Sequence, residues 1–327
     1  MSIDTSEQKI FDFNMIKNKD AKYKAIDLFA GIGGIRQGFE QVFKENISFV
    51  FSSEIDKFAQ TTYNENFGEL PHGDITKIDE ADIPNFDILL AGFPCQPFSN
   101  AGLKKGFTDT RGTLFFDIAR IIKHHMPKVV FLENVKGFKS HNKGNTFSVV
   151  KEILRGFGYT VTSQVLNAKN FGVPQNRERI YIIAFLDCDA NFNFPDSIGK
   201  DTKLGDILES KVEAKYTLSD KLWSGHQKRK EMHKKKGNGF GYSMFDESSV
   251  YTSTISARYY KDGSEILVKQ NDKNPRKLTP REAARLQGFS DDFLIPVSDT
   301  QAYRQFGNSV AVPVINSLAK NIIKVLG

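Results

Sequence analysis

One cysteine stands where its side chain could act as a nucleophile. Cys95 lies in the segment FPCQPFS, directly after the apolar run FDILLAG. A cysteine is more often a small buried apolar residue, but the flanking Pro94 and Pro97 favour an exposed loop at the end of a strand. A thiolate in that position can attack an electron-poor carbon and form a transient covalent bond. We therefore predict that Cys95 is a catalytic nucleophile.

A carboxylic acid is expected at a neighbouring strand end. Glu133 begins the tripeptide ENV at the end of the apolar run KVVFLENV. Burial at the end of an apolar strand disfavours the charged form of a carboxyl group, which can then donate a proton. A helix cap or a salt bridge would explain the same residue, so the sequence alone leaves these roles open.

A glycine-rich segment precedes both residues in the chain. The sequence DLFAGIGG places Gly31, Gly33 and Gly34 between an expected strand and an expected helix. At such a turn the bare backbone can approach a ligand, and the amides that begin the helix face a negative group. A glycine turn that only packs the strand against the helix explains this segment equally well.

Two carboxylates complete a possible adenosine pocket. Glu54 follows the next expected strand, where a carboxylate can bind ribose hydroxyls, and Asp74 lies after the next segment, where it can accept from the adenine amine. Each would also serve as a helix N-cap. The glycines read GxGG and lack the GxGxxG pattern of nicotinamide enzymes. The pattern favours S-adenosylmethionine, whose amino-acid carboxylate the helix amides after Gly34 could receive.

These residues require a fold that brings several strand ends together. From residue 23 to residue 185, the apolar runs AIDLFA, SFVFSSE, FDILLAG, KVVFLENV and RIYIIAF alternate with helical stretches. Those stretches include IRQGFEQVF, TLFFDIARIIKHH and TFSVVKEILRGFG. The alternation predicts an α/β fold with a doubly wound, mostly parallel, Rossmann-like sheet. Ligands of such sheets bind at the carboxyl ends of the strands.

A second, smaller domain is expected after Pro195, where the alternation stops. Lys-rich and Gly-rich segments, HQKRKEMHKKK and GNGFGYSMF, precede the strand-like ISARYY and SEILV. TPREAARLQGF carries a proline at its first helical position, and VPVINSLAKNIIKVL predicts a final helix that returns to the large domain. The expected organisation is an N-terminal extension at 1–22, a catalytic and cofactor-binding domain at 23–194, the smaller domain at 195–274 and a returning segment at 275–327.

The composition is that of a folded protein. The chain has 327 residues, of which 39% are hydrophobic, enough for a buried core. Its two cysteines are too few for a disulfide framework or a four-cysteine metal site, and we expect no bound metal. The first residues lack the pattern of a secretory signal, so we expect a cytoplasmic protein without a membrane contact. The net charge of +6 permits a polyanionic partner without requiring one.

Five motifs, taken in order, resemble those of the cytosine-5 DNA methyltransferases, above all the enzymes of bacterial type II restriction-modification systems. They are DLFAGIGG, FPCQPFS, ENV, QNRERIYI and QAYRQFGNSV. The resemblance extends from about residue 23 to residue 327 and is weakest between 195 and 274. It implies transfer of a methyl group from S-adenosylmethionine, with S-adenosylhomocysteine as product, to C5 of a flipped cytosine in a short double-stranded DNA sequence. It also implies that 195–274 is a target-recognition domain.

The resemblance further implies a role for individual residues. Cys95 would add to C6 of cytosine while Glu133 protonates or hydrogen-bonds N3. Arg177 and Arg179 would hold the base and the region of this carboxylate, although surface pairing with Glu178 also explains them. Phe29 would stack on adenine. The implied cofactor-binding residues are Phe29, Gly31, Gly33, Gly34, Glu54, Ile55, Asp74, Ile75, Pro94, Leu114, Asn308 and Ser309.

Contacts with DNA are expected in two regions. A loop at 94–112 would close behind the flipped base, and the segment TISARYY would lie near the DNA backbone or bases. The expected DNA-contacting residues are Gln96, Ser99, Thr254 and Arg258. The basic residues between 228 and 236 would contact phosphates or form a solvated helix face. GNGFGY and SARYYKDGSEIL resemble the recognition segments of enzymes that act on CC-GG-type sites.

Three other functions compete with DNA methylation. One branch of the same family keeps PPCQPF and ENV while methylating transfer RNA, but here the motif reads FPCQPF. A DNA-binding protein that has lost catalysis would not need Cys95, Glu133 and Arg179 together. A nicotinamide-dependent dehydrogenase would explain the sheet and Glu54 only. We expect a monomer that is paired in function with a restriction endonuclease without forming a stable complex.

Overall fold

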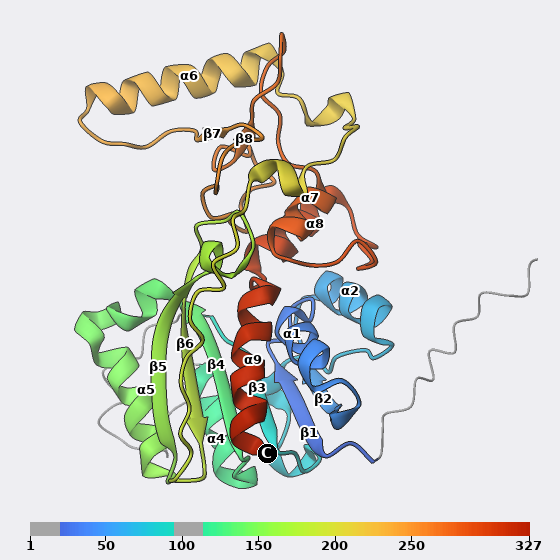
Figure 1. Ribbon diagram of the computed structural model, residues 1–327, viewed down its shortest axis with the longest axis vertical. Coiled ribbons are helices and arrows are strands. Elements are labelled where there is room, and N and C mark those ends of the chain that lie inside the picture. The colour runs from blue at the N-terminus through green and yellow to red at the C-terminus, as the bar shows by residue number, and fades with distance from the viewer. Residues whose placement is uncertain (1–19, 95–113) are drawn as a thin grey trace, which may run out of the picture.

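The computed structural model describes residues 20–94 and 114–327. A six-stranded sheet forms the centre of its large lobe (Figure 1). The strands are β1 (Tyr23–Leu28), β2 (Ile47–Ser53), β3 (Ile88–Gly92), β4 (Val129–Val135), β5 (Thr160–Asn167) and β6 (Glu178–Phe185). They lie in the order β2-β1-β3-β4-β6-β5. Strands β2, β1, β3 and β4 are mutually parallel, and β6 runs antiparallel to β4 and β5. The mostly parallel sheet that the sequence predicts is confirmed.

The order of the strands creates a site for a ligand. Strand β1 lies between β2 and β3, so the chain leaves β1 towards one side of the sheet and later returns to its other side. The carboxyl ends of β1 and β3 therefore flank a topological switch point, where open α/β sheets bind their ligands. The motifs DLFAGIGG and FPCQPFS begin at these two strands.

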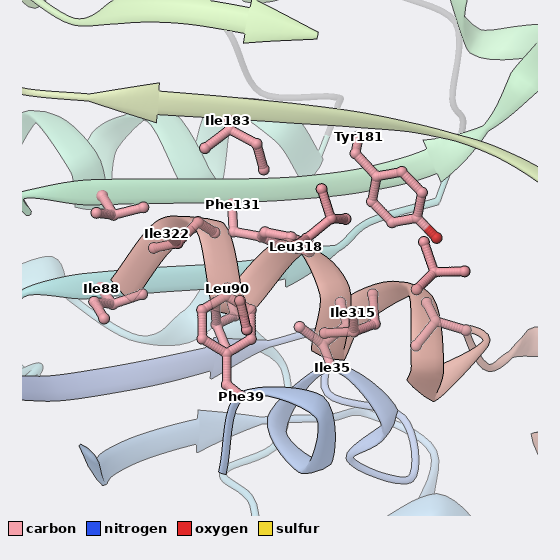
Figure 2. Packing of buried hydrophobic residues seen from close by; sticks show 14 of the residues in the cluster. Ile35, Phe39, Ile88, Leu90, Phe131, Tyr181, Ile183, Ile315, Leu318 and Ile322 are labelled. Carbon is pink, nitrogen blue, oxygen red and sulfur yellow. The ribbon is translucent and has the colours of Figure 1, made fainter. Parts of the chain in front are cut away.

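Helices cover both faces of the sheet. The helices are α1 (Gly34–Phe43), α2 (Lys57–Phe67), α4 (Leu114–His125), α5 (Asn145–Gly156), α6 (Asp220–Lys235), α7 (Pro280–Leu286), α8 (Asp299–Asn308) and α9 (Val312–Leu326). On one face, Phe39 of α1 and Leu318 of α9 pack with Leu90 and Phe131 of the strands (Figure 2). On the other face, apolar side chains of α4 and α5 cover the same strands. The doubly wound arrangement is thus confirmed.

The C-terminal helix belongs to this core. The continuous segment Asp299–Leu326 is long and apolar enough to cross a membrane by length and composition. In α9, however, Ile315, Leu318 and Ile322 are fully buried against the sheet and α1. A core helix of a globular protein has this composition for the same reason. The last helix of the chain therefore packs on the sheet of the large lobe.

The small lobe, which contains α6, α7 and α8, has its own apolar cluster. Ile255, Tyr259 and Leu278 are fully buried there, together with side chains from α7 and α8. Ile32 and Ala59 of the large lobe join the same cluster, so the two lobes share packed surface. A short parallel pair, β7 (Met244–Phe245) and β8 (Leu267–Val268), lies in this lobe.

Two local expectations differ from the structure. The segment ISARYY is not a strand: its buried residues, Ile255 and Tyr259, are four apart, and the Tyr259 hydroxyl closes a compact turn by donating to the Ile266 carbonyl. The expected strand SEILV shortens to β8. Strand β5 was missed because its sequence, TVTSQVLN, is polar and mostly half-buried, as suits the edge of a sheet.

A glycine on α1 allows the close contact with α9. A Cβ added at Gly38 would lie 2.6 Å from the Ile315 Cβ. We expect Gly38→Ala to lower the free energy of unfolding by about 1–2 kcal/mol, because overpacking outweighs the better helix propensity of alanine. Gly225 of α6 has no atom within 4 Å of an added Cβ, so Gly225→Ala should raise the same quantity by about 0.5–1 kcal/mol. Urea denaturation measures both, and a stabilised Gly38→Ala variant would contradict this packing.

Candidate active site

A cavity of about 470 Å³ opens at the carboxyl ends of β1, β3 and β4, at the switch point of the sheet. Residues from α8 and the turn after it close its other side. The predicted cofactor residues that line it are Phe29, Gly31, Gly34, Glu54, Ile55, Asp74, Ile75, Pro94, Leu114, Asn308 and Ser309. Glu133 and Arg179 line the same cavity, whereas Gly33 and Arg177 lie outside its lining. Strand ends far apart in sequence therefore contribute to one cavity.

The turn after β1 has an unusual backbone. Phe29 and Gly31 both have φ near +55°, a left-handed conformation that costs a residue with a side chain about 1 kcal/mol or more. A Cβ added at Gly31 would meet no atom within 4 Å, so this glycine leaves open space in the cavity that it lines. Gly33 has another reason to be glycine: a Cβ there would lie 2.1 Å from the Phe67 ring. The turn thus presents bare backbone to a ligand.

Glu54 connects the ends of two strands. Its carboxylate accepts from the backbone N–H of Gly31 at 2.8 Å and from that of Asp56 at 2.8 Å. Burial raises the pKa of Glu54, and these two backbone donors oppose the rise. The helix cap of α2 is Asp56, which accepts from Phe58 N, so capping is not the role of Glu54. Glu54 instead positions the glycine turn and lines the cavity.

Asp74 serves as a local cap and also lines the cavity. Its carboxylate accepts from the Thr76 hydroxyl at 2.8 Å and from the Thr76 backbone N–H at 3.1 Å. The Thr76 hydroxyl is the largest cause that lowers the pKa of Asp74. An ionised carboxylate with free lone pairs can accept a further hydrogen bond from a ligand amine. The capping interpretation and the ligand interpretation are therefore compatible.

A buried carboxyl group faces a guanidinium group in the wall of the cavity. Glu133 Oε1 lies 3.2 Å from Arg179 Nε, and Glu133 is 9% exposed. Burial raises the pKa of Glu133, while the charges of Arg179 and Arg177 oppose the rise. Glu133 lies opposite Gly92 in the β3–β4 register, which brings it beside the strand that leads to Pro94. The site therefore holds an acid whose proton is retained to higher pH than usual.

Asn134, to which the sequence analysis assigned no role, holds the end of β3 in place. Its amide donates to the Phe93 carbonyl at 2.9 Å, and its own carbonyl accepts from Val135 N. The first of these bonds fixes the end of β3 directly before Pro94. Asn134 also lines the cavity. Asn134 belongs to the motif ENV at the end of a buried strand, and this position was the feature of the sequence that could have indicated its place at the site.

The predicted residues for DNA contact and nucleophilic attack are only partly placed. Cys95, Gln96 and Ser99 lie outside the described residues, so their roles remain predictions. Thr254 donates from its hydroxyl to the Asn176 carbonyl at 2.6 Å, which joins the small lobe to the start of β6. Arg258 is exposed on the small lobe.

Arg177 joins three segments of the chain. Its guanidinium donates to the carbonyls of Ile255 and Gly307, at 3.1 and 3.0 Å, and to the carbonyl of Ser309. A Cβ at Gly307 would lie 2.3 Å from the backbone of Ser256, so the segments meet as bare backbone. The guanidinium keeps its charge at neutral pH even where burial lowers its pKa. Arg177 thus holds the small lobe against the turn that lines the cavity.

This arrangement predicts different effects for the two neighbouring arginines. The planar guanidinium group of Arg177 donates to three carbonyls from separate N–H groups. A lysine at position 177 has one ammonium group and cannot reach all three carbonyls. We expect Arg177→Lys to lower the free energy of unfolding by about 2–4 kcal/mol, because buried carbonyls lose their donors. Arg179→Lys should cost less than half of that, since lysine can still pair with Glu133. Urea denaturation of both variants tests this, and equal losses would contradict the anchoring role of Arg177.

Comparison with known proteins identifies close relatives. The family model described as C-5 cytosine-specific DNA methylase matches residues 23–324. The chain is 62% identical to Type II methyltransferase M.SsoII of Shigella sonnei, over 94% of this chain and 82% of that protein. It is also 62% identical to Type II methyltransferase M.NlaX of Neisseria lactamica, over 92% of this chain and 96% of that protein. The S. pombe Dnmt2 methyltransferase has the same fold, with a TM-score of 0.77 at 22% identity over 93% and 99% of the two chains.

Proposed function

The chain belongs to the C-5 cytosine-specific DNA methylase family and is a DNA cytosine-5 methyltransferase that uses S-adenosylmethionine, and we propose on this basis that it methylates a flipped cytosine within one short double-stranded sequence. One observation carries the proposal: the cavity brings Glu133 and Arg179 beside the expected adenosine residues, with Pro94, the neighbour of Cys95, on its wall. Carbon 5 is inaccessible inside a stacked duplex, so the target base must leave the helix to enter the cavity.

The part of the cavity lined by Phe29, Glu54 and Asp74 fits the cofactor. When bound, S-adenosylmethionine supplies an electrophilic methyl group. The open space at Gly31 admits a ligand close to the backbone, and the Phe29 ring offers an apolar surface for adenine. Glu54 and Asp74 supply acceptors for ribose hydroxyls and the adenine amine. Ser309 lies against the first residue of α1, where a Cβ on Gly34 would lie 2.7 Å from its hydroxyl, so both can meet the amino-acid end.

The part of the cavity lined by Glu133 and Arg179 fits the chemistry of cytosine. The Cys95 thiolate would form a bond to C6 while Glu133, in its protonated form, donates to N3 and stabilises the added negative charge. C5 then has enamine character and accepts the methyl group. Loss of the C5 proton to water and return of the N3 proton to Glu133 would restore the C5–C6 double bond as the bond between C6 and the Cys95 sulfur breaks and the thiolate leaves. Arg179 holds Glu133 in place and offers a donor to the base.

The biological setting follows from the type II relatives. We place the enzyme in the cytoplasm as a monomer that protects DNA from a cognate restriction endonuclease, without a stable complex between the two proteins. The short sequence it modifies is proposed to be of the CC-GG type. The resemblance of GNGFGY and SARYYKDGSEIL to recognition segments of enzymes with such sites supports this assignment.

Bisulfite sequencing tests the proposed reaction and its specificity together. Plasmid is prepared from a methylation-deficient bacterial host that expresses either the wild-type chain or Cys95→Ser. We expect protected cytosines at one recurring short sequence with the wild-type chain and complete conversion with the variant, because a serine hydroxyl is a far weaker nucleophile than a thiolate. Protection by the variant would rule out the covalent scheme. Complete conversion with soluble, cofactor-binding wild-type protein would direct the search to transfer RNA, the alternative substrate.

A separate prediction concerns the acid. Glu133→Gln keeps a hydrogen-bond donor for N3 but removes the transferable proton and the ion pair with Arg179. We expect kcat to fall by about 10²–10⁴-fold, the usual contribution of a positioned acid. The matched control is Glu178→Gln at the start of β6, the strand beside β4. This variant breaks the ion pair of Glu178 with Lys136, at 2.9 Å, and should leave kcat unchanged. Tritium transfer from labelled cofactor to duplex DNA measures both, and wild-type kcat in Glu133→Gln would remove Glu133 from the mechanism.

A further inference from the structure

Helix α6 lies at the outer end of the small lobe, away from the sheet (Figure 1). All sixteen of its residues are described, and His226 is the one that is buried. The helix contains six lysine or arginine residues and two acidic ones. A helix with so little apolar surface gains little from packing, so its composition calls for another explanation than a core.

One side of α6 is held firmly by the small lobe. Trp223 packs edge to face with Tyr242 at a ring distance of 4.8 Å, and Lys230 lies over the same Tyr242 ring at 4.1 Å. Arg229 pairs with Asp262 at 3.2 Å. These contacts occupy two of the basic side chains and fix the direction in which the opposite side of the helix points. Arg229 and Lys230 therefore have structural roles.

The opposite side carries what we call the lysine stripe, defined as Lys221, Lys228 and Lys235. These residues recur every seven positions, so they lie on one side of the helix at intervals of about 10 Å. All three are exposed. Within the described part of the chain, no carboxylate lies within ion-pair distance of any of them. The stripe is thus a row of unneutralised positive charge on a rigid support.

We propose that the lysine stripe binds phosphates of duplex DNA that flank the methylated sequence. This inference rests on the proposed function, because it takes double-stranded DNA as the substrate. A row of ammonium groups complements the regular negative charge of a phosphate backbone. The target base enters the cavity at the strand ends, whereas α6 lies at the far end of the small lobe, so the stripe meets DNA outside the target. Its contribution is to affinity and is independent of the flanking sequence.

The test compares two triple variants of the full-length protein. The first is Lys221→Gln, Lys228→Gln and Lys235→Gln. The control removes the same charge from α5 and α9 by Lys151→Gln, Lys320→Gln and Lys324→Gln. Dissociation constants are measured over a salt series, with S-adenosylhomocysteine present, for two duplexes that carry the sequence found by bisulfite sequencing. One duplex has about 40 base pairs and the other about 12, which leaves little flanking DNA.

We expect the stripe variant to bind the long duplex at least about tenfold more weakly at 0.1 M salt and to lower the slope of log K against log salt by about 2–3. Its affinity for the short duplex, and the affinities of the control variant, should match those of the wild-type chain. An unchanged slope, or an equal loss on both duplexes, would overturn the inference. Wild-type protein that neither binds nor methylates duplex DNA would instead refute the proposed function.

Discussion

The gap between the carboxyl ends of β1 and β3 is the constraint on which the site depends. Because the chain order reverses between these strands, no crossover helix fills the space above them, and the turns that follow can face one another. The Phe29–Gly31 turn, Glu54 and Pro94 all reach the cavity for this reason. The neighbouring strand β4 contributes Glu133 through its parallel register with β3, in which Glu133 stands opposite Gly92. The positions of the expected cofactor residues and of Glu133 are thus consequences of strand order.

The small lobe closes this gap through buried polar contacts as well as apolar packing. Arg177 lies at the start of β6 in the large lobe, yet its donors go to Ile255 of the small lobe and to the turn at 307–309. Burying a guanidinium group costs free energy unless carbonyl groups accept its hydrogen bonds. The three segments are therefore held in one arrangement. The same turn presents Asn308 and Ser309 to the cavity. The contact therefore links the expected DNA-reading segment to the cofactor end of the site.

The sequence predicted those parts of the molecule in which local pattern and tertiary environment agree. Buried parallel strands read as apolar runs, and the predicted cofactor residues follow such runs directly, so most of them line one cavity. The half-buried edge strand β5 has no apolar run and was missed. ISARYY was misread because its buried residues are four apart and form a turn. The anchoring contacts of Arg177 depend on segments more than 70 residues away, which periodicity within the motif does not reveal.

The environment of Glu133 shows why an acid and an arginine are placed together at this site. Burial favours the neutral carboxyl group, while Arg179 at 3.2 Å favours the carboxylate. Neither influence acts alone here, because burial retains the proton on the carboxyl group and the ion pair favours its release. In the proposed reaction, a base that enters the cavity would displace water and draw donors of Arg179 towards itself. Both changes would stabilise the carboxylate less, so the proposed acid form would be favoured with the substrate in place.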